Sequence, residues 1–444
     1  MQKIAVLALL VALLTSCGGS EPKSVAVAIP VPTSKSGVEP SVAKLLNKTG
    51  HNLSQAMDDP QKWMTHGSAL FANAYYNEAV VAFTQAITIK PKMPQATYLL
   101  ATALWKVNKQ EEATQALQTS LDLIPEYDRG WRLLAEWQLE RGEIVLAETS
   151  ARKAFELNPT RIGTRYLLAQ SLMDQENYEE ALSLLEEVIS INKAPRWIYT
   201  LASQCYRQLG KLELSEQALA KSGPPFVDWP DPMYKHIPNL IAGKAEIAFY
   251  ALHLNRVNGS ETALPFLMKA NKINPEHVDV RVAFSIALQD NGQLDDAKRL
   301  LIELQGEPNT NYWKQFASVC IASQEWEEAQ QHIEIAFGLN PEDANAHDIA
   351  AMIANKQGDT VEASRLWEEA GRLHANQKQW SKAELSLAFA DENGDLSNEG
   401  LQALALAQIE LGHFMQAKTI IQQLLAIESN NEEALTLQRR LPTE

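Results

Sequence analysis

Residues 94–127 have the sequence PQATYLLATALWKVNKQEEATQALQTSLDLIPEY, in which a short polar stretch separates two helix-like runs. Apolar and small residues recur at the spacing of one helix face in each run: Leu100, Ala101 and Leu104, then Ala113, Leu117 and Ser120. Such spacing predicts two helices. Pro125 follows the second run, and proline cannot continue a helix, so the sequence predicts a helical hairpin that ends there.

The same pattern recurs along the chain with a period of 34 residues. A pair of small residues, twelve positions apart, occurs five times without a slip: Gly67/Ala79, Ala101/Ala113, Ala135/Ala147, Ala169/Ala181 and Ser203/Ser215. Prolines follow the same interval, at Pro91, Pro125 and Pro159. A small residue lets two helices cross closely, because a larger side chain would force their backbones apart. A period of this length is typical of stacked supersecondary units rather than of a globule around one active site.

These features resemble the tetratricopeptide repeat. Three units carry the pattern: Trp63, Gly67, Leu70, Ala79, Phe83, Ala86 and Pro91; Trp131, Leu134, Ala135, Ala147, Ala154 and Pro159; and Trp313, Phe316, Ala317, Ala329, Ala336 and Pro341. Later small pairs are Ala251/Ala263, Ser285/Ala297, Ala317/Ala329, Ala351/Ala363 and Ala405/Ala417. The resemblance covers most of residues 58–431, as ten units, and implies an all-α fold, an α-solenoid of stacked helical hairpins. It also implies binding rather than catalysis, because the family is a scaffold for many partners.

Slips in the repeat register divide the chain. The step from Ser203 to Ala251 is 14 residues longer than one unit, and the excess falls on the proline-rich stretch 223–232. We therefore expect a first stack over 58–222, a proline-rich break over 223–238 and a second stack over 239–431. Residues 432–444 are expected to form a capping helix that covers the apolar end of the solenoid. A helix-like stretch around 378–390 has no matching partner in the pattern.

The N-terminus has the pattern of a secretory signal. Lys3 precedes an almost wholly apolar run over residues 4–14, which is too short to span a bilayer stably. The sequence Leu-Thr-Ser-Cys at 14–17 resembles the bacterial lipobox, which implies a lipoprotein signal peptide over 1–16 and a lipid on Cys17. An ordinary signal peptide with a chance cysteine is the alternative. Residues 17–57 are then expected to be a lipid-attached tether. The residue after the cysteine is Gly18 and not aspartate. By resemblance to Gram-negative sorting patterns, this implies attachment to the outer membrane, with the protein facing the periplasm of the cell envelope.

Composition and motif searches argue against several classes of function. The net charge of −16 disfavours nucleic acid and anionic lipid headgroups as partners. The nine histidines form no metal-binding pattern, and no nucleophile elbow or phosphate loop occurs, so we expect no catalysis, no cofactor, no metal and no small-molecule substrate. Cys205 and Cys320 are expected to be small buried thiols.

The family resemblance places a partner-binding groove on the first helices of the units. In the first stack the groove-facing positions include Met64, Phe71, Tyr98, Trp105, Arg129, Arg132, Tyr166, Met173, Trp197 and Arg207. Aromatic, methionine and arginine side chains carry much of the energy of protein interfaces. Burial in a tightly coiled superhelix, or under the tether, is the alternative for these side chains. The same positions in the second stack are more polar and include Asn345, Asp348 and Asn355.

Three functions remain open from the sequence. The first is a non-catalytic, lipid-anchored scaffold that binds a peptide or helix of a partner protein in its concave groove. The second is a glycan-binding or polysaccharide-export accessory lipoprotein, because aromatic grooves also stack sugars. The third is an enzyme at the proline-rich break, where only Asp228, Asp231 and His236 are available. Residues 229–236 serve either as a rigid break pinned by aromatic side chains or as a contact loop. The sequence identifies neither the partner, the pathway, the organism nor the oligomeric state.

Overall fold

The structure is a computed structural model that describes residues 27–32, 38–190, 194–223, 231–304, 309–394 and 396–442. Within these ranges the chain folds into helices joined by short turns and contains no β-strand, which confirms the predicted all-α solenoid. None of the described helices is long and apolar enough to cross a membrane. The predicted signal peptide over 1–16 and the lipidation site Cys17 lie outside the described residues.

The first stack consists of five helical hairpins. Their helices are α3 (Pro60–Ala72), α4 (Tyr76–Ile89), α5 (Pro94–Lys106), α6 (Gln110–Leu123), α7 (Asp128–Glu140), α8 (Ile144–Leu157), α9 (Ile162–Met173), α10 (Tyr178–Ile189), α11 (Arg196–Gln208) and α12 (Leu212–Ala220). The small pairs lie where the two helices of a hairpin touch, and both Ala101 and Ala113 are fully buried. A Cβ atom on Gly67 would lie 2.9 Å from the ring of Phe83, so this contact has no room for a side chain.

The second stack follows the same plan with two departures. Its helices are α13 (Lys244–Ile273), α14 (Val278–Asp290), α15 (Leu294–Ile302), α16 (Thr310–Ala322), α17 (Trp326–Leu339), α18 (Ala344–Gln357), α19 (Thr360–Asn376), α20 (Trp380–Asn393), α21 (Asn398–Leu411), α22 (Phe414–Ile427) and the terminal α23 (Glu432–Arg439). The first departure is in α13, which bends at Gly259. Glycine adopts the positive φ of 81° there without strain, so the two halves of α13 form one hairpin.

The second departure corrects the prediction that the stretch 378–390 lacks a partner. This stretch forms α20, which packs against α19. The contact uses a further small pair, Gly371 and Ala383, again twelve residues apart, and both are buried. The helix α19 therefore packs on two neighbours, α18 before it and α20 after it. The pair was missed because Gly371 follows Ala351 by only 20 residues, out of register with the 34-residue period.

The predicted tether over 17–57 is wrong for its C-terminal part. Residues Pro40–Ser54 form helix α2, which packs on α3 through its buried face of Val42, Leu46, Thr49 and Leu53. Thr49 Oγ1 lies 2.8 Å from Nδ1 of His66, and Nε2 of His66 lies 2.9 Å from the carbonyl oxygen of Pro30. The carbonyl can only accept, so Nε2 carries the proton. Burial of an apolar helix face explains why this segment belongs to the solenoid.

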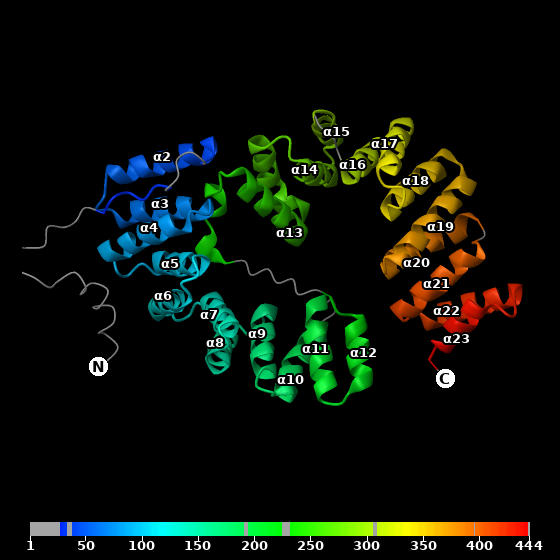
Figure 1. Ribbon diagram of the computed structural model, residues 1–444, viewed down its shortest axis with the longest axis horizontal. Helices are drawn as coiled ribbons and strands as arrows, with labels where there is room; N and C mark the ends of the chain where they lie inside the picture. Colours follow the sequence, from blue (N-terminus) through cyan, green and yellow to red (C-terminus); the bar gives the residue numbers. More distant parts are fainter. Residues whose placement is uncertain are drawn as a thin grey trace, which may run out of the picture.

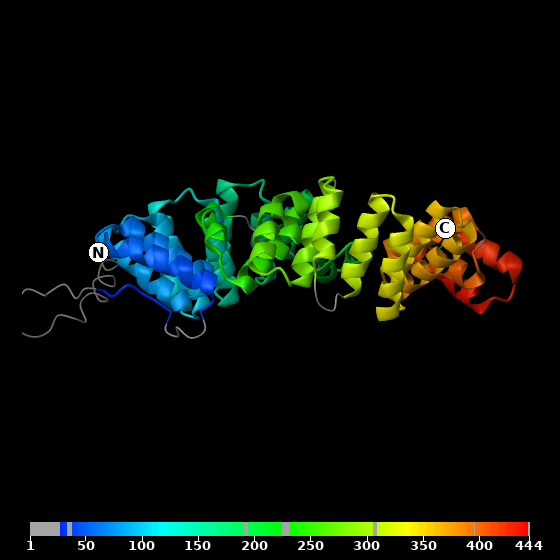
Figure 2. The same ribbon diagram turned by 90° about the horizontal axis from the view of Figure 1, so that it is seen from above.

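The two stacks meet at their N-terminal ends. Figure 1 shows the first stack descending from α3 to α12, while the second starts at α13, beside the first hairpins, and curves away to α23. The hydroxyl of Ser41 on α2 donates to the carbonyl of Ala242, and the backbone N–H of Lys244 donates to the carboxylate of Glu39, at 2.8 Å each. Seen from above, the array is elongated, with the N-terminal helices at one end and the C-terminal helices at the other (Figure 2).

Candidate partner-binding grooves

The predicted groove of the first stack, here called the first groove, already holds a segment of the chain itself. Residues 231–243, here called the docked segment, include the short 3₁₀ turns η2 (Pro232–Tyr234) and η3 (Pro238–Leu240), which pack on α5 and α3 respectively. Asp231 anchors the beginning of the segment. Its carboxylate accepts a hydrogen bond of 2.5 Å from the hydroxyl of Tyr98 and a second hydrogen bond from the hydroxyl of Tyr127. A carboxylate that accepts hydrogen bonds from two hydroxyl groups forms charge-assisted hydrogen bonds, which are stronger than hydrogen bonds between neutral groups.

The phenols at this anchor are held in their protonated form. Burial raises the pKa of Tyr98, Tyr127 and Tyr234 above the usual value for tyrosine, and the negative charge of Asp231 raises all three further. A phenol whose pKa is raised keeps its proton and remains a hydrogen-bond donor at neutral pH. Tyr98 and Tyr127 can therefore both donate to the carboxylate of Asp231 at neutral pH.

Tyr234 packs the docked segment against the first two hairpins. Its ring is stacked on Phe71 at 6.2 Å between centroids and meets Tyr98 edge-on at 5.9 Å. The amide of Gln95 donates to the carbonyl of Met233 at 3.0 Å. These contacts agree with the reading of residues 229–236 as a break pinned by aromatics, although Trp229 lies outside the described residues.

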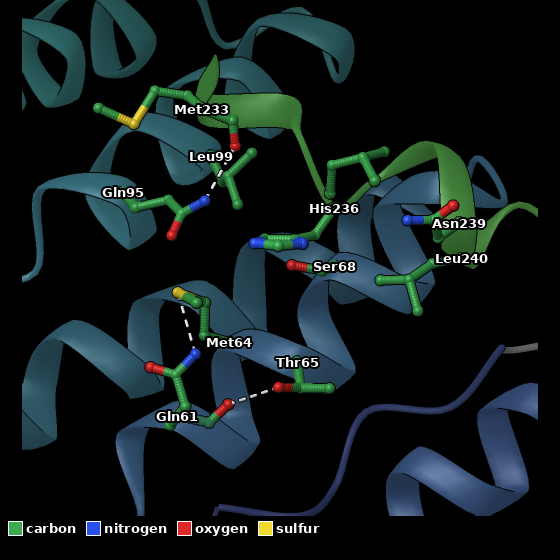
Figure 3. A pocket seen from close by; sticks show the side chains of 11 residues that line it. Gln61, Met64, Thr65, Ser68, Gln95, Leu99, Met233, His236, Asn239 and Leu240 are labelled. Atoms are coloured by element: carbon green, nitrogen blue, oxygen red, sulfur yellow. Dashed lines mark hydrogen bonds between the residues drawn. The ribbon is translucent and has the colours of Figure 1, made fainter.

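A small cavity of about 320 Å³ remains beside the docked segment (Figure 3). It is lined by Met64, Ser68 and Gln95 from the first hairpins and by Met233, His236 and Leu240 from the segment. The predicted enzyme site at the break has no support in this geometry. Asp231 is engaged by two tyrosines, His236 is exposed, and Asp228 lies outside the described residues.

Asn73, directly after α3, holds the other end of the docked segment. Its amide nitrogen donates to the carbonyls of Ala69 and Leu240, at 2.8 and 2.9 Å. Its amide oxygen accepts from the backbone N–H groups of Ala242 and Gly243, at 2.8 and 3.0 Å. Asn73 is 4% exposed, so all four hydrogen bonds of a buried amide are satisfied at this point. One side chain thus joins the first stack to the start of the second.

Two of the predicted groove residues are not available to a partner. Tyr98 is fully buried beneath the docked segment, and Arg132 is 3% exposed, with Nη1 donating to Glu136 at 2.9 Å. Their exposure was predicted wrongly because the repeat pattern cannot show that the chain fills its own groove. Trp105 is half-buried and stacks on Trp137 at 4.4 Å, with their planes 3° apart, so each indole covers one face of the other.

The remaining predicted residues keep part of their surface. Met64 lines the small cavity and Phe71 contacts Tyr234, as described above. Further along the stack, Tyr166 on α9 meets Trp197 on α11 edge-on at 5.0 Å. On α7, α9 and α11, the predicted residues that keep partial or full exposure are Arg129, Tyr166, Met173, Trp197 and Arg207. No test of partner binding distinguishes these residues, so their role stays a prediction.

The second stack contains a larger groove between α18 and α20. Its volume is about 630 Å³, and it is lined by Asn345, Asp348, Met352, Asn355, Trp367, Lys382, Leu385, Ser386, Phe389, Glu392 and Asn393. We call it the α18–α20 groove. Three apolar side chains keep much of their surface in it: Leu385 is 56% exposed, Met352 44% and Phe389 39%. Asn345, Asp348 and Asn355 are predicted groove positions on α18, which also carries Met352. Leu385 and Phe389 come from α20, which had no place in the repeat pattern.

Hydrogen bonds hold the polar wall of this groove in place. The Asp348 carboxylate lies 2.8 Å from Nε2 of His374, which is fully buried, and accepts from the hydroxyl of Ser386 at 2.6 Å. The ammonium of Lys382 donates to the amide oxygen of Asn345 at 2.8 Å. The groove therefore combines fixed polar groups of α18, beside Met352, with the exposed apolar side chains Leu385 and Phe389 of α20. Ligand pockets combine apolar surface with a few placed polar groups in this way.

Comparison with known proteins agrees with this architecture. The family model described as tetratricopeptide repeat matches residues 70–136 and 172–236. This chain contains tetratricopeptide repeats. A second model, described as anaphase-promoting complex, cyclosome, subunit 3, matches residues 127–188. A search of curated proteins finds no match. The repeats make this protein an interaction scaffold of a family that is generally non-catalytic.

Solved structures resemble the tetratricopeptide-repeat array at low identity. The complex of Naa15 and Naa10 bound to HypK-THB is 15% identical, with 90% of this chain and 78% of that chain covered and a TM-score of 0.31. PilF from Pseudomonas aeruginosa is 16% identical, with 44% and 96% covered and a TM-score of 0.27. YrrB, described as a TPR protein with an unusual peptide-binding site, is 16% identical, with 47% and 98% covered and a TM-score of 0.25. Such values carry no conclusion about a partner or a process.

Proposed function

We propose that this tetratricopeptide-repeat scaffold binds a segment of a partner protein in the α18–α20 groove. The observation that carries the proposal is the exposure of Leu385, Met352 and Phe389 within one groove of about 630 Å³. Exposed apolar side chains gathered in a concave surface are typical of interaction sites. The first groove is a weaker candidate over its first two hairpins, because the docked segment fills it.

The two walls of the groove suit an extended or helical peptide. The apolar wall of α20 can take up side chains of the partner, while the asparagines and Asp348 of α18 can hydrogen-bond its backbone. Asn345 and Asp348 are already oriented by Lys382 and His374, so little conformational entropy is lost when a partner binds. Preorganisation of this kind raises affinity without any additional contact area.

Introduction of a charge into the apolar surface of α20 tests this site. A photo-crosslinking residue at position 385, in cells that express the full chain, is expected to capture a protein that position 339 does not capture. With that partner purified, Leu385→Glu is expected to weaken the binding of the partner at least about tenfold, because the substitution places a charge where an apolar side chain would be buried in the complex. Leu339→Glu is the matched control, since Leu339 is 55% exposed but lies outside the groove. Equal losses in both variants, or equal crosslinks, would rule the groove out.

We also propose that a lipid on Cys17 anchors the protein to a membrane of the bacterial envelope, at the outer membrane and facing the periplasm. The lipobox-like sequence at 14–17 supports this proposal. Several acyl chains bury many methylene groups, at about 0.8 kcal/mol each, so such an anchor is stable. Incorporation of labelled palmitate in the producing cells is expected to disappear in Cys17→Ser. Label that survives this substitution would contradict the anchor.

The glycan-binding alternative has no observation in its favour. Sugars stack on the open faces of aromatic rings. In the first groove, however, Trp105 and Trp137 stack on one another, and Phe71 stacks on Tyr234. These rings therefore do not form a free platform for a sugar.

A further inference from the structure

Three side chains that bind transition metals converge between α16 and α17. They are Cys320 on α16, and Glu328 and His332 on α17. Their thiol, carboxylate and imidazole atoms all lie within 4.8 Å of one another. The sequence search for metal motifs missed this cluster, because the cysteine and the histidine belong to different helices of a hairpin.

The helical hairpin explains why the three groups meet. Ala317 and Ala329 are fully buried at the helix contact, so α16 and α17 approach closely. Glu328 and His332 are four residues apart and share one face of α17. Their Oε1 and Nε2 atoms are 3.7 Å apart. Two ligands in a tetrahedral zinc shell with bonds of about 2.1 Å lie about 3.4 Å apart, so this pair needs only a small movement.

His332 is the second, independent observation. Both of its ring nitrogens are buried and neither makes a hydrogen bond, because the nearest carboxylate oxygen, on Glu328, is 3.7 Å from Nε2. Such an arrangement is costly for a buried polar group. The ring lies between Phe316, at 3.9 Å between centroids, and Trp313, at 5.4 Å. The neutral imidazole is the form of histidine that binds metals. A bound cation would supply the partner that the imidazole lacks.

Lys298 on α15 supplies a positive charge to the same place. Its ammonium donates to the carboxylates of Glu325 and Glu328, at 2.5 and 2.6 Å. The lysine side chain is 22% exposed, so it can turn outwards into solvent. A cysteine binds a metal as its thiolate, so the proton of the Cys320 thiol has to leave when a metal binds. A divalent cation must therefore compete with both the ammonium and the thiol proton.

We propose that Cys320, Glu328 and His332 form a binding site for Zn²⁺, with Lys298 turned away and water or Glu325 completing the shell. A soft thiolate with an imidazole and a carboxylate favours zinc over magnesium or calcium. On binding, the S–H bond of Cys320 breaks, a Zn–S bond forms, and the proton passes to solvent. The metal would staple α16 to α17. This inference is independent of the partner groove and of the lipid anchor.

Titration of the reduced, metal-free full chain with Zn²⁺ against a chromophoric chelator tests the site. Co²⁺ serves as a spectroscopic substitute, because a cobalt–thiolate bond gives a charge-transfer band in the near ultraviolet. We expect a single site and a band that is absent in Cys320→Ser. His332→Gln is expected to weaken zinc binding at least about tenfold, since even groups that only support a ligand have effects of this size. Lys298→Met is expected to strengthen binding about threefold or more, because a competing cation is removed.

Cys205→Ser is the matched control. Cys205 is as deeply buried as Cys320 and lies on α11, the first helix of its own hairpin. Among the described residues, however, it belongs to no group of potential metal ligands. This variant is expected to keep the cobalt band. Glu328→Gln, at a partly exposed position, provides a ligand variant with little risk to folding, and circular dichroism checks its helix content. Absence of the band, or its persistence in Cys320→Ser, overturns the proposal and leaves only an ion-pair cluster around Lys298.

Discussion

Asn73→Ala is expected to release the docked segment and to separate the two stacks at their shared end. The substitution leaves the carbonyl of Leu240 and the N–H groups of Ala242 and Gly243 without their partner. A buried donor or acceptor left unsatisfied costs about 1–3 kcal/mol, so three such groups predict a loss of about 3–5 kcal/mol after partial hydration. Small-angle X-ray scattering should show a larger radius of gyration, and limited proteolysis should cleave within residues 231–243.

Asn393→Ala is the control for this experiment. Asn393 is the last residue of α20 and donates to the carbonyl four residues earlier, Phe389, at 2.7 Å, just as Asn73 donates to Ala69. It has no hydrogen bond to a distant segment among those described, so its loss is expected to leave the scattering profile unchanged. An unchanged profile for Asn73→Ala as well would mean that the other contacts, including the hydrogen bonds of Ser41 and Glu39, hold the junction without Asn73.

Gly371→Leu is expected to destabilise the second stack by about 3 kcal/mol or more, through overpacking. A Cβ atom on Gly371 would lie 2.4 Å from Cγ of Leu387, which is itself fully buried and cannot move into solvent. The helices α19 and α20 would have to separate, and the wall of the α18–α20 groove would move with them. Urea denaturation followed by circular dichroism measures the loss in free energy of unfolding.

Gly338→Leu tests whether the effect comes from the close helix contact. Gly338 lies in α17, is exposed, and a Cβ atom there would meet nothing within 4 Å. This substitution is expected to be neutral or stabilising by up to about 1 kcal/mol, because leucine favours the helix more than glycine does. Combining Gly371→Leu with Leu387→Ala should recover part of the stability. Equal effects of the two glycine substitutions would show that packing at Gly371 is not limiting.

Some features of the structure could be predicted because they depend on local spacing. Each small pair encodes a close crossing between two helices that are adjacent in sequence, and Ala101 and Ala113 are fully buried, as that rule requires. The tether was predicted wrongly over α2, although Val42, Leu46, Thr49 and Leu53 share one helix face. The 34-residue pattern predicts only the helices that belong to its units, and α2 precedes the first of them.

The sequence alone determined the repeated hairpin, because neighbouring helices carry both halves of each contact within 34 residues. Only the tertiary structure decided which grooves are open. Tyr98 and Asp231 are 133 residues apart, and Asn73 and Gly243 are 170 apart, so no local pattern relates them. Cys320 and His332, by contrast, are twelve residues apart, which is the spacing of the small pairs, so their meeting follows from the packing of α16 against α17 within one hairpin. The repeat period encodes contacts between helices that are adjacent in sequence. The return of a distant segment to an earlier groove depends instead on the complementarity of the two surfaces, which no period encodes.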